Sequence, residues 1–232
     1  YTADPRVVPD ARKLDDITYE EMLELAQYGA QVMMPRSVEL AQIWSVPLEV
    51  RSSYSTETGT RIGGNMEDVS RVAGIAHQAA VAKVTFVALV DRPGIAQTIF
   101  AALTARQVHA DLIVQNIGHQ GRTDLSFTVP ESDMEAAGEA ADEVRENVDA
   151  QSVTVKGGLA KVSVVGAGLS SSLEYASIMF GTLGDLGVNI DMISTSGIRI
   201  TCVIDGDRVH EAVRALHRAF RLGGEDSWSA TA

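Results

Sequence analysis

The run Asp91-Arg92-Pro93-Gly94 is the part of the chain best suited to bind a small charged molecule, because it follows an apolar run and opens a predicted helix. Proline is favoured in the first helical turn, and an aspartate just before it can cap free backbone N–H groups. A helix N-terminus also attracts carboxylates, since several N–H donors and the positive end of the dipole point the same way. Gly94 removes a side chain that would block a close approach. The run predicts either a capped turn or a carboxylate-binding site.

Polar side chains on two later predicted strands are expected to face such a site. They are Asp111, Gln115 and Asn116 in one segment, and Asn189, Asp191, Ser194 and Ser196 in another. An α-amino acid needs donors for its carboxylate and acceptors for its ammonium group. A lysine ligand would also need a carboxylate for its distal charge, which Asp111 can supply, whereas threonine would need a hydroxyl or amide partner. The alternative is that Asn189 and Asp111 only cap strand ends.

The sequence predicts no catalytic residue and no metal site. The histidines are His77, His109, His119, His210 and His217, and none has a second histidine or a cysteine at metal-ligand spacing. The single cysteine, Cys202, falls in the alternating apolar run 198–204, which indicates a buried structural thiol rather than a nucleophile.

Composition and charge exclude several classes of partner. Apolar residues make up 45% of the chain and charged residues 22%, which is typical of a globular protein. The net charge of −12 argues against a nucleic-acid partner, because a polyanion would be repelled on average. No apolar run approaches the length of roughly 20 residues that a membrane helix needs. We expect a cytoplasmic protein with no membrane partner. Tyr1 in place of an initiator methionine also suggests a fragment.

An internal repeat determines the predicted fold. Residues 82–87 (AKVTFV) resemble residues 160–165 (AKVSVV), and residues 108–113 (VHADLI) resemble residues 188–193 (VNIDMI). Two similar segments in the same order and at nearly the same separation indicate a duplicated unit. Each copy is predicted to run β-α-β-β-α-β, the ferredoxin-like arrangement. The fold class is therefore α+β, with tandem ferredoxin-like modules whose free edges favour pairing.

The predicted elements and boundaries follow from apolar spacing and from turn residues. Helices are predicted at 95–106, 133–147, 175–186 and 208–220, and strands at 110–116, 125–129, 152–155, 190–196 and 198–204. Before the repeat, Thr18-Tyr19-Glu20-Glu21 has the form of a capping box at a helix start. A second helix is predicted at 37–43, a strand at 46–50, a linker at 56–68 and a possible extra strand at 72–77. Gly157-Gly158 and Gly223-Gly224 are interpreted as turns. The predicted domains are 1–65, 66–158 and 159–232.

The chain also resembles a known family over essentially its whole length. Tyr1-Thr2-Ala3-Asp4-Pro5-Arg6 resembles the segment of aspartate kinases that closes over ATP. Further resemblances lie in residues 11–14, 19–29, 35–38, 50–53, 114–116, 189–196 and 222–225. The resemblance implies that residues 1–65 are a C-terminal fragment of an α/β amino acid kinase domain and that the repeats are ACT modules. It also implies the phosphorylation of L-aspartate by MgATP, as the first step toward lysine, threonine and methionine.

The same resemblance implies roles for particular residues. Tyr1, Arg6 and Val32 would contact the nucleotide. Asp91, Pro93, Gly94, Ala96, Asp111 and Gln115 would line a site for lysine, threonine or both, together with Asn189, Ile190 and Ser196 from a partnering second module. ATP and magnesium would serve the complete enzyme, and we expect no cofactor and no kinase activity in this fragment. Expected partners are a second copy of the chain through ACT–ACT pairing, or a full-length kinase subunit. Two alternatives remain: a separate regulatory subunit, or an ACT sensor on another amino-acid enzyme.

Overall fold

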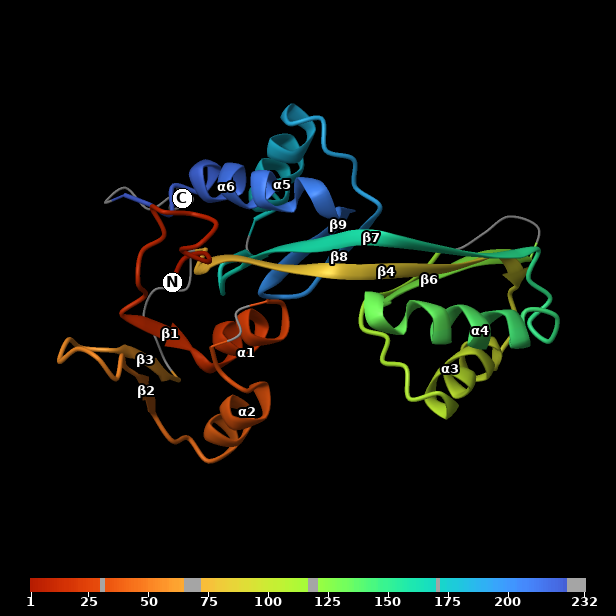
Figure 1. Cartoon of the computed structure of the whole chain (residues 1–232), viewed down its shortest axis with the longest axis horizontal. Coiled ribbons are helices and arrows are strands. Elements are labelled where there is room, and N and C mark those ends of the chain that lie inside the picture. The colour runs from red at the N-terminus through yellow and green to blue at the C-terminus, as the bar shows by residue number, and fades with distance from the viewer. Residues whose placement is uncertain (30–31, 65–71, 117–120, 170–171, 225–232) are drawn as a thin grey trace. The chain divides into compact units, whose positions relative to one another are not determined.

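The computed structural model describes residues 1–29, 32–64, 72–116, 121–169 and 172–224. The chain divides into two compact units, of which one combines Tyr1–Gln78 with Lys161–Ala232 and the other is Ala79–Ala160. The chain passes from the first unit into the second along strand β4 (Gly74–Val90), and it returns along strand β7 (Ser152–Val165). Figure 1 shows both as long strands.

The unit Ala79–Ala160 has the ferredoxin-like fold that the repeat predicts. Its strand order is β5-β6-β4-β7, and one face of the sheet carries both of its helices (Figure 1). The elements are α3 (Ile95–Ala105), β5 (Ile113–Gln115), β6 (Arg122–Pro130), a short 3-10 turn η1 (Glu131–Asp133) and α4 (Met134–Val144). Phe86 and Phe127 are fully buried between sheet and helices. The predicted helices and strands of this copy are confirmed, with bounds that differ by a few residues, except that the strand predicted at 152–155 extends to Val165.

The second copy of the fold lies in the other unit and takes its fourth strand from an earlier part of the chain. Its strand order is β8-β9-β7, followed on the far side of β7 by the first residues of β4. The Ala73 N–H donates to the Val165 carbonyl at 2.7 Å. The elements are α5 (Glu174–Asp185), β8 (Met192–Thr195), β9 (Arg199–Asp205), a 3-10 turn η3 (Gly206–Arg208) and α6 (Val209–Ala219). The extra strand expected at 72–77 is therefore the start of β4.

The N-terminal part of the first unit forms a small sheet with two helices. The sheet has the order β1-β3-β2, and the elements are β1 (Asp16–Thr18), α1 (Tyr19–Gln27), α2 (Pro35–Ile43), β2 (Leu48–Val50) and β3 (Thr60–Gly63). The capping box is confirmed: the Thr18 hydroxyl accepts from the Glu21 N–H at 3.2 Å, and Glu21 Oε2 accepts from the Thr18 N–H at 3.1 Å.

Two predictions about connecting segments were wrong. The linker predicted at 56–68 contains β3, where Ile62 is 1% exposed and pairs with β1 and β2; residues 65–68 lie outside the described residues. Gly157 and Gly158 lie inside β7 rather than in a turn. A Cβ on Gly157 would lie 2.8 Å from Met134 Sδ, and the Gly158 N–H donates to Glu131 Oε1 at 2.7 Å. These glycines therefore allow the start of α4 to approach the strand closely. Gly223 lies in a turn, as predicted.

Candidate functional site

A cavity of about 500 Å³ opens at the start of α3, in the unit Ala79–Ala160. Its lining comes from the turn before α3, the first residues of α3 and the end of β5: Val90, Asp91, Arg92, Pro93, Gly94, Ile95, Ala96 and Gln115. The structure thus brings together Asp91, Pro93, Gly94, Ala96 and Gln115, all of which the sequence placed at one site.

The first turn of α3 presents backbone donors that no side chain caps. The N-cap is Gly94, and no side-chain hydrogen bond is made there. The predicted cap by Asp91 was wrong, and Pro93 lies in the turn before the helix rather than in its first turn. The Asp91 N–H donates instead to the Gly121 carbonyl at 2.9 Å. Because the N–H groups of a first helical turn lack intrahelical partners, they remain available to an anion in the cavity.

Gly94 is required by its backbone conformation and also faces open space. Its φ is +91°, which lies in the left-handed region that favours glycine. A Cβ added there would meet nothing within 4 Å. The chain therefore turns sharply into α3 and leaves the helix N-terminus uncovered at this point.

Gln115 supplies the amide of the site. It is the last residue of β5, an edge strand that pairs with β6 and places Gln115 opposite Leu125. Its exposed side chain lines the cavity. An amide can both donate and accept hydrogen bonds, so it suits either charged end of an amino acid.

Asp111 has local hydrogen-bond partners and is not among the cavity-lining residues. Its Oδ1 accepts from the Leu112 N–H at 2.8 Å and from the Thr128 hydroxyl on β6. These contacts match the strand-end alternative. Asn189, Ile190 and Ser196 lie in the other unit, around β8, where Asn189 and Ser196 are exposed. Effector binding by these four residues stays a prediction.

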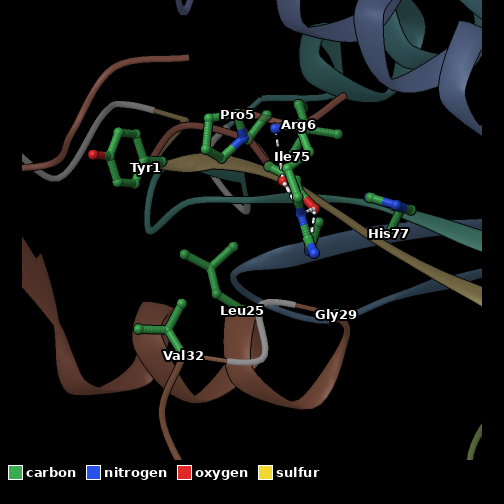
Figure 2. Close-up of a pocket in the computed structure, with 11 residues that line it drawn as sticks. Tyr1, Pro5, Arg6, Leu25, Gly29, Val32, Ile75 and His77 are labelled. Carbon is green, nitrogen blue, oxygen red and sulfur yellow. Dashed lines mark hydrogen bonds and ion pairs between the residues drawn. The ribbon is translucent and has the colours of Figure 1, made fainter. Parts of the chain in front are cut away.

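The three residues predicted to face a nucleotide line one cavity in the first unit. Tyr1, Arg6 and Val32 surround a space of about 330 Å³, with further walls from α1 and from the start of β4: Ala3, Asp4, Pro5, Leu25, Gly29, Ile75, Ala76 and His77. Figure 2 shows Leu25 and Val32 pointing from the α1 side toward Tyr1 and Pro5. Tyr1 and Val32 also line a second cavity of about 330 Å³ bordered by the small sheet.

Two charged residues that line the cavity around Tyr1 and Val32 form an ion pair. Arg6 forms an ion pair with Asp4, with Nη2 2.8 Å from Oδ2, and this partner lowers the pKa of the Asp4 carboxyl. The Arg6 side chain is 87% exposed, so its guanidinium remains accessible to an anion such as a phosphate.

His77 is a cavity residue that the sequence did not single out for this site. Its ring meets the His210 ring of α6 edge to face, with centroids 5.5 Å apart. Partial burial and the neighbouring His210 lower the pKa of His77. No sequence signal marks His77, because its neighbours in space come from α6 and from residues 1–6.

Among the residues that the structure describes, no group of three or more histidine, cysteine or acidic side chains is placed to hold an ion. His119 lies outside the described residues. Cys202 is fully buried in β9, and burial raises the pKa of its thiol to about 12, which confirms the interpretation as a structural thiol. Among the described helices none is long and apolar enough to cross a membrane.

Comparisons with known proteins assign the two parts of the chain to known families. Residues 84–144 and 162–220 match the ACT domain, and residues 1–52 match the amino acid kinase family. The aspartokinase of Corynebacterium glutamicum is 43% identical over 97% of this chain. The chain belongs to the aspartate kinase family. It matches the C-terminal, regulatory part of that family's members and spans about half of this relative's length, 55%.

Two solved aspartate kinase structures extend the comparison. The regulatory subunit of aspartate kinase from Thermus thermophilus, in its ligand-free form, is 35% identical with a TM-score of 0.60; the match covers 64% of this chain and 98% of that one. Escherichia coli aspartokinase III in complex with lysine and aspartate is 26% identical with a TM-score of 0.77, covering 94% of this chain and 48% of that one.

Proposed function

We propose that the ACT modules of this aspartate kinase chain bind free L-lysine, L-threonine or both, and that binding inhibits the attached kinase. The observation that carries this proposal is the uncapped start of α3, which opens onto a cavity of about 500 Å³ beside Gln115. The lysine complex of the related E. coli enzyme supports the choice of ligand class.

The residues around α3 account for recognition of a zwitterion. The ligand carboxylate would accept from the free N–H groups of the first turn of α3, where the helix dipole adds attraction. The ligand ammonium would be held by Asp91 and by the Gln115 amide oxygen. Asp111 is the proposed partner for a distal ammonium, and Asn189, Ile190 and Ser196 are proposed to contribute from a second module. Such a site distinguishes an amino acid from a simple anion, because it supplies partners for both charges.

The complete protein is proposed to phosphorylate the side-chain carboxylate of L-aspartate with MgATP. Tyr1, Arg6 and Val32 would contact the nucleotide, and Mg²⁺ would arrive with ATP as part of the substrate. Phosphoryl transfer depends on many groups that position the substrates and stabilise charge. Only residues 1–52 of this chain match the amino acid kinase family. We therefore propose that the chain alone has no kinase activity. Aspartyl phosphate trapped with hydroxylamine from the isolated chain would disprove that point.

A separate regulatory subunit is the second candidate. The Thermus thermophilus regulatory subunit is matched over nearly all of its length. Against this candidate, residues 1–52 add a kinase-family segment before the ACT modules. A reading frame that begins inside this chain would favour the subunit, and one that extends upstream through a kinase domain would favour a single polypeptide. The match to the kinase family also disfavours an ACT sensor on an unrelated enzyme.

Pairing of ACT modules is proposed as the mode of assembly. Strands β5 and β8 lie at sheet edges, and each exposes an isoleucine: Ile113 is 50% exposed and Ile193 is 43% exposed. Edge strands with unpaired backbone groups favour the addition of another strand. The domain boundaries after residues 65 and 158, and a cytoplasmic location, also remain proposals.

Calorimetry with L-lysine and with L-threonine tests the binding function. We expect saturable heat with at least one of them, loss of most of that heat in Gln115→Ala, and no change in Gln151→Ala, which alters an exposed glutamine outside the cavity. Absence of binding by either amino acid would refute the proposal. Equal binding by both variants would place the site elsewhere.

A further inference from the structure

Arg199 is a buried arginine in the second ACT module that neither proposed site uses. It is the first residue of β9 and is only 7% exposed. A buried arginine requires close partners, because an unpaired charge in the interior carries a large desolvation penalty. Its partners therefore indicate what it does.

These partners lie mainly on helix α1 of the kinase-family segment. Arg199 Nε lies 2.8 Å from Glu24 Oε2, and both side chains are largely buried, at 8% and 18% exposed. The two atoms do not meet hydrogen-bond geometry, so the contact is an ion pair. The Arg199 guanidinium carbon lies 3.9 Å from the centre of the Tyr28 ring, in a cation–π contact. One side chain of β9 thus contacts both Glu24 in the last turn of α1 and Tyr28, the C-cap residue of that helix.

Arg199 is itself held in place from within its own module. Its Nη1 donates to the Thr201 hydroxyl at 2.6 Å, and that hydroxyl lies 2.7 Å from the Ser163 hydroxyl of β7. Thr201 and Ser163 are fully buried. A guanidinium held by such partners has little freedom to reorient, because its planar fork is pre-organised for these hydrogen bonds.

The end of α1 that Arg199 holds is also a wall of the nucleotide-facing cavity. Leu25 lies between Glu24 and Tyr28 in sequence, and Leu25, Gly29 and Val32 line that cavity (Figure 2). Gly29 packs directly on the backbone of the opposite wall, since a Cβ there would lie 1.8 Å from the His77 carbonyl oxygen. The opposite wall is the start of β4, which serves as the fourth strand of the second module.

We propose that Arg199 is a positioning residue through which the second ACT module sets the width of the nucleotide cavity and thereby the affinity for MgATP. This inference rests on the proposed kinase function, because it takes this cavity as the nucleotide site. The inference adds a route for regulation. A change in the position of β9 would move α1, and the cavity wall formed by Leu25, Gly29 and Val32 would move with that helix.

The test is the dissociation constant for MgATP, measured by calorimetry on the complete protein that contains this chain. Arg199→Met removes the charge and the stacking plane but keeps the length of the side chain. We expect it to weaken MgATP binding about fivefold or more, the lower end of typical couplings between sites, with a smaller change in kcat than in the KM for ATP. Arg199→Lys keeps only the charge and should restore part of the affinity.

Arg208→Met is the matched control. Arg208 also belongs to the second module and pairs with a glutamate, Glu211 at 2.8 Å, but both side chains are partly exposed, and Arg208 donates a further hydrogen bond to the Leu186 carbonyl in its own module. We expect wild-type MgATP affinity in this variant. If Arg199→Met fails to fold, Tyr28→Leu removes the ring that stacks on Arg199 while leaving Arg199 and Glu24 in place, and it should still weaken MgATP binding.

Each result supports or overturns the inference. Wild-type affinity in Arg199→Met, or in Tyr28→Leu if the first variant cannot be made, would overturn the positioning role while leaving the proposed function intact. Equal losses in Arg199→Met and Arg208→Met would also overturn it, because a general loss of stability would then explain the effect. Failure of the wild-type protein to bind MgATP would overturn the proposed kinase function and this inference together.

Discussion

Substituting Gly29 by alanine tests the packing of α1 against β4 more directly than any other single change. Gly29 has a φ of +133°, a conformation that side chains strongly disfavour, and an added Cβ would lie 1.8 Å from the His77 carbonyl oxygen and 2.6 Å from its carbon. Real Cβ atoms do not approach other atoms closer than 3.0 Å. The α1 end and the β4 backbone must therefore move apart, and neither is a flexible side chain.

The expected loss of stability follows from two contributions. A side chain held in a sparsely populated backbone region costs about 1–3 kcal/mol. Forcing an extra carbon into a packed contact costs typically about 1–3 kcal/mol more. We therefore expect Gly29→Ala to lower the free energy of unfolding of the first unit by about 4 kcal/mol.

Gly94→Ala is the matched reference. It makes the same chemical change at another positive φ, +91°, but the new Cβ meets nothing within 4 Å. Backbone strain alone predicts a loss of about 1–2 kcal/mol. Urea unfolding followed by circular dichroism gives the midpoints, and hydrogen exchange assigns lost protection to α1 and β4 in the first variant and to α3 in the second. Equal losses in the two variants would refute the close contact between Gly29 and His77.

Two further predictions concern titratable groups. His217 of α6 is 2% exposed and its Nε2 lies 2.9 Å from the Thr2 hydroxyl, and burial lowers the pKa of His217 below its ordinary value of 6.5. The unfolded state then binds more protons than the folded state, so the free energy of unfolding should fall as pH decreases through 6.5 toward the lower folded pKa. In His217→Gln the urea midpoint should depend less on pH than in the wild-type protein. The same pH dependence in both proteins would contradict this prediction. Because burial raises the pKa of Cys202 to about 12, the native protein at pH 8 should react with a thiol reagent far more slowly than the urea-unfolded chain, and rapid native labelling would contradict the buried position.

The helices and central strands were predictable from the sequence because their signals are local. The apolar spacing of residues 95–106 gives α3, and the capping box at Thr18 marks the start of α1, since both depend on residues within one or two turns. The duplicated pattern gave the ferredoxin-like order of each copy before any tertiary contact was known.

The missed features depend on contacts between distant parts of the chain. Strand β3 has one fully buried residue, Ile62, and its pairing with β1 and β2 leaves little trace in its own composition. The start of β4 joins the second module only because it lies beside β7, more than eighty residues later. Gly157 resembled a turn residue because its close neighbour, Met134, comes from another element.

The residues of the candidate sites also differ in whether local sequence signals identify them. The turn before α3 and the glutamine at the end of β5 could be named from the sequence, because the family resemblance and the helix-start pattern point to the same residues. His77 and Arg199 could not, since each acquires its role from a partner on another element.

Backbone amide shifts during titration with L-lysine and L-threonine test the central claim most directly. If a free amino acid binds at the uncapped start of α3, the amide resonances of Ile95, Ala96 and Gln97 should move in a saturable way with at least one ligand, while glycine methyl ester, which lacks the free carboxylate, should leave them in place. Saturable shifts confined to other parts of the chain, or no shifts with either amino acid, would contradict the account.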